Sequence, residues 1–377
     1  MSGIYIHIPY CKQACHYCNF HFSTTLKNKN EVIKAMLKEI KIKSQAYNEI
    51  VETIYFGGGT PSLLEIKEIN YLIDTVCKNF KISSNLEITL EANPDDLTIH
   101  KLKELSKSKI NRLSIGVQSF LDDDLKLMNR AHSSKVSKKC IENSKKYFKN
   151  ISIDLMYGMP DSNLESWEYN LDLAISFNIS HISAYALTIE PKTALERYVR
   201  KGTIKLLDEE IVFKQYELMF KKLTDQKYVN YEFCSFGKEG YFSKNNTAYW
   251  LRKKYLGIGP SAHSFNGVLR SWNISNNNLY VKAIMNNQMY YESEKLSLTD
   301  QYNEYIMTGL RTMWGVSTDY LNDNFGLNYK NHFIEKSQKF INSKHLKTEN
   351  NIIKTTFDGK FLSDGIASDL FIVNLLN

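Results

Sequence analysis

Apolar residues in the amino-terminal half of the chain follow two alternating patterns, short β-rich runs and longer helical periods. The β-rich runs predict strands at residues 3–8, 53–56, 86–91, 112–117, 151–156 and 181–187. Between these runs, apolar side chains return at helical spacing, as over residues 32–40 and 165–177. Another helix is expected to begin at Ser62, because Ser62 and Glu65 have the spacing of a capping box.

Repeated strand–helix units predict a parallel sheet whose connections are right-handed crossovers. Such units form either an open doubly wound sheet or a partial barrel, and periodicity alone leaves both architectures open. In both, the functional groups lie at the carboxyl ends of the strands. We therefore expect the chemistry in the segments that directly follow the predicted strands.

The alternation fades after residue 201, and the rest of the chain has a different pattern. Helical segments are expected at residues 209–223, 299–313 and 329–342. A β-hairpin region is expected over residues 346–361, and its turn signals include Asp358-Gly359. We therefore expect an α/β fold with two domains, a strand–helix domain over residues 1–225 and a smaller α+β domain over residues 226–377.

Charge and hydropathy narrow the class of protein without identifying it. The 377 residues contain 48 Lys and Arg against 41 Asp and Glu, a net charge of +7. The lysines are spread over helix faces instead of forming a stripe with aromatic residues, so we expect no nucleic-acid partner. No apolar run reaches the roughly 18 residues of a membrane span, so we expect no integral membrane segment, and peripheral membrane contact stays open. Residues 1–9 lack the features of a secretory signal, which predicts a cytoplasmic protein.

Three of the six cysteines, Cys11, Cys15 and Cys18, fall within eight residues directly after the first predicted strand. In a reducing compartment this density of thiols favours a metal site over a disulfide. A [4Fe–4S] cluster held by three thiolates leaves one iron open to an external ligand, and the spacing favours this cluster. Zinc stays the alternative, with a nearby histidine as the fourth ligand. The nearby histidines are His7, His16 and His21.

The cysteine spacing C-x₃-C-x₂-C, with Tyr17 before the last cysteine, resembles the signature of the radical S-adenosylmethionine (SAM) enzymes. This resemblance implies a partial (β/α)6 barrel and a [4Fe–4S] cluster whose open iron is chelated by SAM. It also implies that the reduced cluster can cleave SAM to a deoxyadenosyl radical.

Further motifs at the expected strand ends extend the resemblance through the chain. They are Tyr5–Cys11, Phe56–Pro61, Glu91–Pro94, Ile115–Phe120, Asp154–Pro160 and Leu256–Gly259. In this order they resemble the oxygen-independent coproporphyrinogen III oxidases and the related heme chaperones of the HemW branch.

The resemblance also implies roles for individual residues beside the cysteines. The residues implied to lie around the cluster and SAM are Tyr5, Tyr17, Gly58, Gly59, Thr60, Glu91, Gln118, Arg130 and Asp154. The glycines and Thr60 contact the methionine part of SAM in the family, and the two tyrosines neighbour the cluster. A carboxylate at Glu91 suits the ammonium group or the ribose hydroxyls of SAM.

Sequence differences between the two branches favour the heme chaperones. The oxidases carry an additional cysteine where this chain has Phe20, and they have an N-terminal extension before the cluster motif. Residues 245–250 resemble the H-N-x-x-Y-W motif of the chaperones, which is implicated in heme handling, with Asn245 in place of histidine. An amide is a poor axial ligand to heme iron, whereas imidazole is a good one. The candidate heme residues are Asn245, Tyr249, Trp250 and His263.

These patterns favour a heme chaperone that carries a SAM-liganded [4Fe–4S] cluster, takes electrons from a donor and passes heme to acceptor proteins. The same motifs are compatible with an enzyme, an oxygen-independent coproporphyrinogen III oxidase that decarboxylates propionates through a radical. A zinc-stabilised binding module is the third interpretation. The sequence leaves open whether SAM is cleaved.

Overall fold

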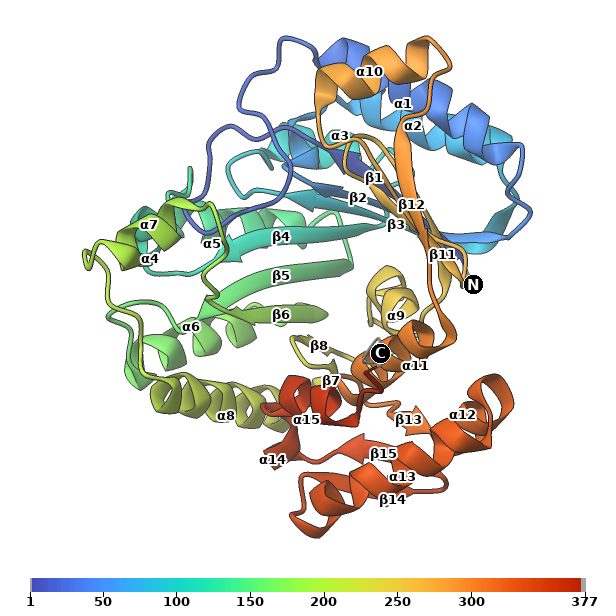
Figure 1. The fold of residues 1–377 in the computed structure, drawn as a ribbon. Helices are drawn as coiled ribbons and strands as arrows, with labels where there is room; N and C mark the ends of the chain where they lie inside the picture. The colour runs from blue at the N-terminus through green and yellow to red at the C-terminus, as the bar shows by residue number, and fades with distance from the viewer. Residues whose placement is uncertain (1, 374–377) are drawn as a thin grey trace.

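A curved sheet of twelve strands, all within residues 2–295, organises most of the chain in this computed structural model (Figure 1). The structure describes residues 2–373. The strands of the sheet are β1 (Ser2–Ile8), β2 (Val51–Gly58), β3 (Ile82–Ala92), β4 (Arg112–Gln118), β5 (Asn150–Tyr157), β6 (His181–Ala186), β7 (Val229–Glu232), β8 (Ser235–Gly237), β9 (Lys254–Ile258), β10 (His263–Phe265), β11 (Leu269–Asn273) and β12 (Tyr291–Lys295). Their order across the sheet is β12-β11-β10-β9-β1-β2-β3-β4-β5-β6-β8-β7.

The central strands β9 and β1 to β6 pair in parallel, and the pairs at both ends of the sheet are antiparallel. The register places Ile8 opposite Gly58, and Gly116 opposite Asp154. The carboxyl ends of the parallel strands therefore lie along one edge. This arrangement confirms the partial (β/α)6 barrel expected from the resemblance, and β9 extends it beyond β1.

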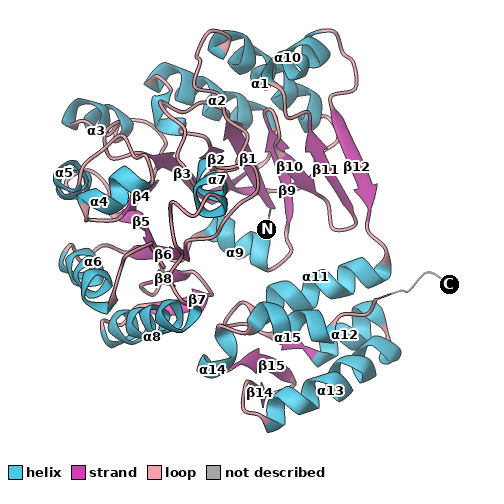
Figure 2. Cartoon of the chain, turned by 60° about the vertical axis from the view of Figure 1, so that its left-hand side comes forward, coloured by secondary structure: helices cyan, strands magenta, loops and turns pink. Residues whose placement is uncertain are grey.

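Most of the helices that follow the strands lie along the outer side of the curved sheet (Figure 2). The helical segments of this unit are α1 (Lys29–Ser44), the 3₁₀ turn η1 (Pro61–Leu63), α2 (Ile66–Asn79), α3 (Ile99–Leu105), α4 (Asp122–Leu127), α5 (Ser134–Ser144), α6 (Leu164–Ser176), α7 (Ala194–Arg200), α8 (Glu209–Asp225), α9 (Lys244–Trp250) and α10 (Asn277–Met285). The apolar stripe of α1, which includes Val32, Met36 and Ile40, is buried against alternate residues of β1 such as Ile4 and Ile6. Helix α9 differs, because it contacts β1, β2 and β9 from the opposite face of the sheet.

The carboxy-terminal residues form a smaller unit with its own core. Its elements are α11 (Leu298–Leu310), β13 (Val316–Ser317), α12 (Thr318–Phe325), α13 (Leu327–Asn342), β14 (Leu346–Glu349), β15 (Ile352–Thr355), α14 (Phe357–Lys360) and α15 (Ser363–Leu370). The core contains Tyr302, Leu310, Phe333 and Leu370. The strands β7 to β12 come after residue 225, where the sequence analysis divides the chain, and they pair within the large sheet. The division into two domains at residue 225 stays a prediction. No helix within the described range has the length and apolar character needed to cross a membrane.

Two local expectations were wrong. Helix α2 begins at Ile66, with Glu65 and Glu68 forming the capping box, because the Ser62 hydroxyl instead donates a hydrogen bond to Asp96 at 2.6 Å. The carboxy-terminal hairpin turns at residues 350–351 and not at residues 358–359, which lie in α14. The two asparagines at 350–351 have positive φ angles of 49° and 62°, and both central residues of a type I′ hairpin turn require positive φ.

Candidate cofactor-binding site

The loop after β1 places the three clustered cysteines at the wall of one cavity. Backbone hydrogen bonds hold this loop, from Cys11 to the Ser23 carbonyl at 3.1 Å and from His16 to the Met128 carbonyl at 3.1 Å. Cys11, Cys15 and Cys18 all line a cavity of about 500 Å³ at the carboxyl ends of the parallel strands. The chain thus brings three thiols to the edge of the sheet where the sequence predicts the chemistry.

Hydrogen-bond donors from other segments reach two of these thiols. The Thr60 hydroxyl donates to Cys11 Sγ at 3.4 Å, and Arg130 Nη1 donates to Cys15 Sγ at 3.4 Å. Arg130 Nη2 also donates to the Asn93 side chain and to the Gly116 carbonyl, both at 2.7 Å. The Nε atom of Arg130 is buried and has no hydrogen-bond partner within residues 2–373. A cation is therefore fixed beside the thiols with unused hydrogen-bonding capacity.

Burial opposes ionisation of the Cys11 and Cys18 thiols. It raises the pKa of Cys11 to about 11, partly offset by the Thr60 hydrogen bond, and it also raises the pKa of Cys18. Thiolates are the form that binds metals. A bound metal centre would supply the positive charge that stabilises them.

The glycine turn after β2 packs directly on the start of the cysteine loop. The Gly59 amide donates to the Ile8 carbonyl at 2.8 Å, and the Thr60 amide donates to the Tyr10 carbonyl at 2.7 Å. A Cβ atom on Gly59 would lie 2.6 Å from the Tyr10 carbonyl oxygen and 2.8 Å from the Ile8 carbonyl oxygen. Gly58 has a φ of +105°, a conformation that glycine adopts most readily. These contacts bring Gly58, Gly59 and Thr60 to the cavity wall, as expected.

Two carboxyl groups lie in the wall of the same cavity with unusual proton affinity. The pKa of Glu91 is raised to about 7, mainly by burial and also by the charge of Asp154, although the hydrogen bond from Tyr55 at 2.7 Å acts in the opposite direction. Burial also raises the pKa of Asp154 to about 6, with Arg112 opposing. A cationic group of a ligand in this cavity would favour the ionised carboxylates.

The raised pKa of Glu91 predicts that the ligand-free protein loses stability as the pH rises. Folded Glu91 keeps its proton up to about pH 7, whereas its ordinary pKa is 4.5. The folded state therefore binds more protons between these values, and the free energy of unfolding falls with pH by about 3 kcal/mol from this group.

Glu91→Gln should remove the part of the pH dependence of stability that comes from Glu91, because glutamine does not titrate. The amide oxygen can still accept the Tyr55 hydrogen bond. We expect the variant to match the wild type at pH 4 and to exceed it by about 3 kcal/mol at pH 8 in urea unfolding. A difference between the two proteins that does not change with pH would contradict the assignment.

The cavity is also lined by residues to which the sequence analysis gave no role. Asn93, Ser114, Met156 and Tyr185 lie in its wall. The signal that could have found them is the period of two along a strand. On β4, Ser114, Gly116 and Gln118 share one face without an apolar side chain, and on β5 Ser152 and Asp154 share one face, whereas an ordinary packed core would have apolar residues there.

The other predicted cofactor residues lie at different distances from the cavity. Gln118, Arg130 and Tyr17 line it, and the Tyr17 hydroxyl is 3.4 Å from Arg130 Nη1. Tyr5 does not line it. Its ring stacks on Tyr55 with centroids 6.2 Å apart, so Tyr5 lies behind the wall that carries Glu91. The roles of these residues stay predictions.

The histidines of the zinc alternative have protein partners. His7 Nε2 lies 2.8 Å from the His21 carbonyl, and His16 Nδ1 lies 2.7 Å from the Leu127 carbonyl. His21 Nε2 lies 2.8 Å from the Asn277 side chain. Across residues 2–373, no three histidine, cysteine, aspartate or glutamate side chains converge closely enough to hold a single metal ion.

The structure does not bring the four candidate heme residues together. Asn245 is buried, and its side-chain oxygen accepts a hydrogen bond from the Thr53 hydroxyl at 3.0 Å. Tyr249 lines another cavity, and Trp250 packs under the Arg311 guanidinium, whose carbon lies 5.4 Å from the ring centroid. His263 is exposed on β10, with its ring beside Trp272. Their roles in heme binding stay predictions.

Comparisons with known proteins agree with this architecture. The profile of the Radical SAM superfamily matches residues 5–174, and that of the HemN C-terminal domain matches residues 296–362. The solved structure of coproporphyrinogen III oxidase (HemN) from Escherichia coli superimposes with a TM-score of 0.83 at 20% identity, covering 98% of this chain and 90% of that chain. At this identity the likeness shows the fold.

Relatives of known sequence match over almost the whole length. The heme chaperone HemW of Bacillus subtilis is 32% identical, covering 97% of this chain and 98% of the relative. The heme chaperone HemW of Lactococcus lactis is 31% identical, covering 97% of this chain and 96% of the relative. This chain therefore belongs to the HemW branch of the radical SAM superfamily.

Proposed function

We propose that this chain is a heme chaperone that holds a SAM-liganded [4Fe–4S] cluster, binds heme and transfers it to acceptor proteins. The observation that carries the proposal is the match over almost the whole chain to relatives named heme chaperones. Phe20 supports it, because it lines the cavity at the position where the oxidases are expected to carry a further cysteine. We also propose that the protein works in the reducing cytoplasm, where its free cysteines would stay available.

The donor set around the cavity fits a cluster held by three cysteines. A cubane binds each thiolate through a different iron, so its sulfur ligands surround a cavity and need not converge on one point. Cys11, Cys15 and Cys18 would supply the thiolates, and the buried Nε of Arg130 offers a donor that no residue in the described range uses. When bound, the cluster supplies one-electron redox chemistry and an open iron. An electron donor is therefore a proposed partner.

The residues around this position have distinct proposed tasks. Thr60 and Arg130 donate hydrogen bonds to thiol sulfur atoms, and such bonds raise the reduction potential of an iron–sulfur centre. Glu91 and Asp154 would neutralise the ammonium group of SAM or accept hydrogen bonds from its ribose hydroxyls. The Gly58–Gly59 turn lets the backbone approach the methionine part closely.

Anaerobic titration with ferric heme tests the proposed function. We expect saturable binding of about one heme per chain, detected as a shifted Soret band, since a specific site has a defined stoichiometry. A linear, unsaturated response would contradict the chaperone. A second assay with coproporphyrinogen III, SAM and a reductant distinguishes the alternative, because formation of vinyl groups would support the oxidase instead.

A further inference from the structure

Another cavity, of about 710 Å³, lies between the large sheet and the carboxy-terminal unit. Tyr249 of α9, Tyr255 of β9 and Phe265 of β10 form one wall, and Leu296 and Met307 from the α11 side form the other. The remaining lining residues are mostly polar or charged, and this volume, with an aromatic wall and a few polar groups, suits a small amphipathic organic molecule. The broad aromatic faces suit a flat, apolar ring system.

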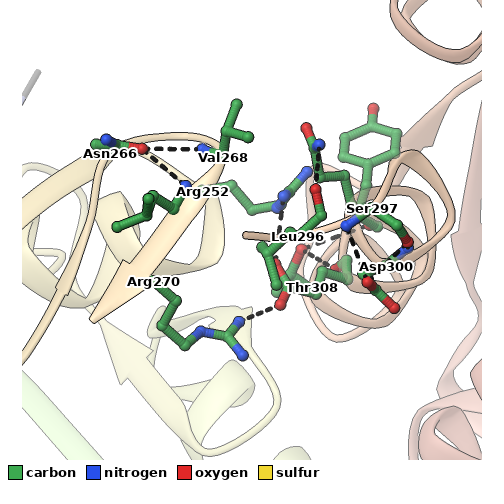
Figure 3. A network of polar contacts seen from close by, with 12 residues as sticks. Arg252, Asn266, Val268, Arg270, Leu296, Ser297, Asp300 and Thr308 are labelled. Carbon is green, nitrogen blue, oxygen red and sulfur yellow. Dashed lines mark hydrogen bonds and ion pairs between the residues drawn. The ribbon is translucent and has the colours of Figure 1, made fainter. Parts of the chain in front are cut away.

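Two arginines at this cavity share one carboxylate. Arg252 Nη2 lies 3.2 Å from Glu304, and Arg270 Nη2 contacts the other oxygen of the same carboxylate. Arg252 follows α9 and Arg270 lies on β11, whereas Glu304 lies on α11, so the contact joins the sheet to the carboxy-terminal unit. Figure 3 shows Arg252 and Arg270 on either side of this contact, beside the helix that carries Asp300 and Thr308.

The arginine pair keeps capacity for another anion. Arg252 Nε is buried and has no hydrogen-bond partner among the described residues, and the Arg252 side chain is only 12% exposed. The other charged groups lie nearer the rim. Glu294 is 48% exposed and 3.3 Å from Arg270 Nη1, and Lys295 is exposed beside it. Asp300 is occupied with the amino-terminal cap of α11, through Ser297.

We propose that this cavity is the heme site and that Arg252 and Arg270 bind the propionate carboxylates of heme, in competition with Glu304. This inference rests on the proposed function. Planar guanidinium groups bind carboxylates through paired, charge-assisted hydrogen bonds, which gives both energy and orientation. The apolar ring would lie against Tyr255 and Phe265, while the propionates exchange an internal ion pair for one with the ligand.

Because Glu304 competes with heme for the arginines, substitutions of the two partners of this ion pair should change heme affinity in opposite directions. Arg270→Gln should weaken heme binding by about 10- to 100-fold, the loss of charge-assisted hydrogen bonds of about 1.5–3 kcal/mol. Glu304→Gln should tighten heme binding by about 3- to 10-fold, because the amide no longer competes for the arginines. A purely structural ion pair would predict that both variants weaken binding. Equal weakening by both would overturn the site.

Controls separate the carboxylate contact from folding and from the proposed function. Arg200→Gln, on the exposed face of α7, should leave the affinity unchanged. With heme dimethyl ester, whose carboxylates are blocked, wild type, Arg270→Gln and Glu304→Gln should bind alike, and a persisting difference would overturn the contact.

If Arg270→Gln fails to fold, the tighter binding of heme by Glu304→Gln, and the loss of this gain with the ester, decide alone. If wild type binds no heme, the proposed function fails. If wild type binds and the variants match it, only the site fails.

Discussion

Replacement of Cys15 by alanine should lower the iron content of anaerobically purified protein from about four atoms per chain to close to none. Cys15 lies in the cavity wall with Cys11 and Cys18, and Arg130 donates a hydrogen bond to its sulfur atom at 3.4 Å. A cubane that loses one of three protein thiolates keeps only two anchors beside the open iron. The measurement is the number of iron atoms and acid-labile sulfide ions per chain in the wild type and in the variant.

The matched control is Cys77→Ser. Cys77 lies on α2, is partly buried and packs against the hydrophobic core outside the cavity. This variant should keep its iron and sulfide, which separates loss of a ligand from a general effect of removing a thiol. The zinc alternative gives a different result. A zinc site would give about one zinc atom per chain and no acid-labile sulfide, and Cys15→Ala would lose the zinc. This result would support a closed tetrahedral zinc site instead of a cluster.

Much of the large unit could be predicted from the sequence because its parallel strands are buried on the helix side. Runs such as residues 112–117 and 151–156 fall within β4 and β5, and the cysteine loop follows β1 as predicted. In such a strand, burial of one face requires apolar residues at alternate positions. A short stretch of sequence is therefore enough to locate the strand. Most of the residues that the resemblance implies to bind the cofactor lie in these strands or shortly after them, and their roles stay predictions.

The missed features depend on contacts between distant segments. Short, partly exposed strands such as β10 and β12 extend the sheet beyond β9, and neither has the continuous apolar run of a central strand. The cap expected at Ser62 failed because Asp96, far along the chain, takes the Ser62 hydroxyl. In the motif at residues 245–250, Asn245 accepts a hydrogen bond from Thr53 and Tyr249 lines the second cavity, and their roles in heme binding stay predictions.

The fold contains two cavities that lie in different parts of the molecule. One cavity opens at the carboxyl ends of β1 to β6 and collects thiols and carboxyl groups. The other lies beside β9 to β12 and α11, where the added strands meet the carboxy-terminal unit. Helix α9 connects them, because it packs on β1 and β2 while its Tyr249 lines the second cavity. The strands added to the barrel therefore form the wall of a cavity that lies outside the barrel.

Replacement of Gly59 by alanine should destabilise the protein by about 3 kcal/mol, since overpacking against fixed atoms costs about 1–3 kcal/mol or more. The new Cβ would lie 2.6 Å from the Tyr10 carbonyl oxygen and 2.8 Å from the Ile8 carbonyl oxygen, and backbone atoms cannot rotate away as a side chain can. The end of β1 would have to move, and with it the segment that leads to Cys11. We therefore also expect the variant to lose most of its iron.

The contrasting substitution is Gly365→Ala in α15, where a Cβ meets no atom within 4 Å and the backbone is helical. This change should raise the free energy of unfolding by about 0.5 kcal/mol, because alanine loses less conformational entropy in a helix. Denaturant unfolding of both ligand-free variants gives the comparison. If Gly59→Ala were as stable as the wild type and kept its iron, the glycine turn would not be what positions the cysteine loop, and the hydrogen bonds from Gly59 and Thr60 to β1 and Tyr10 would be incidental.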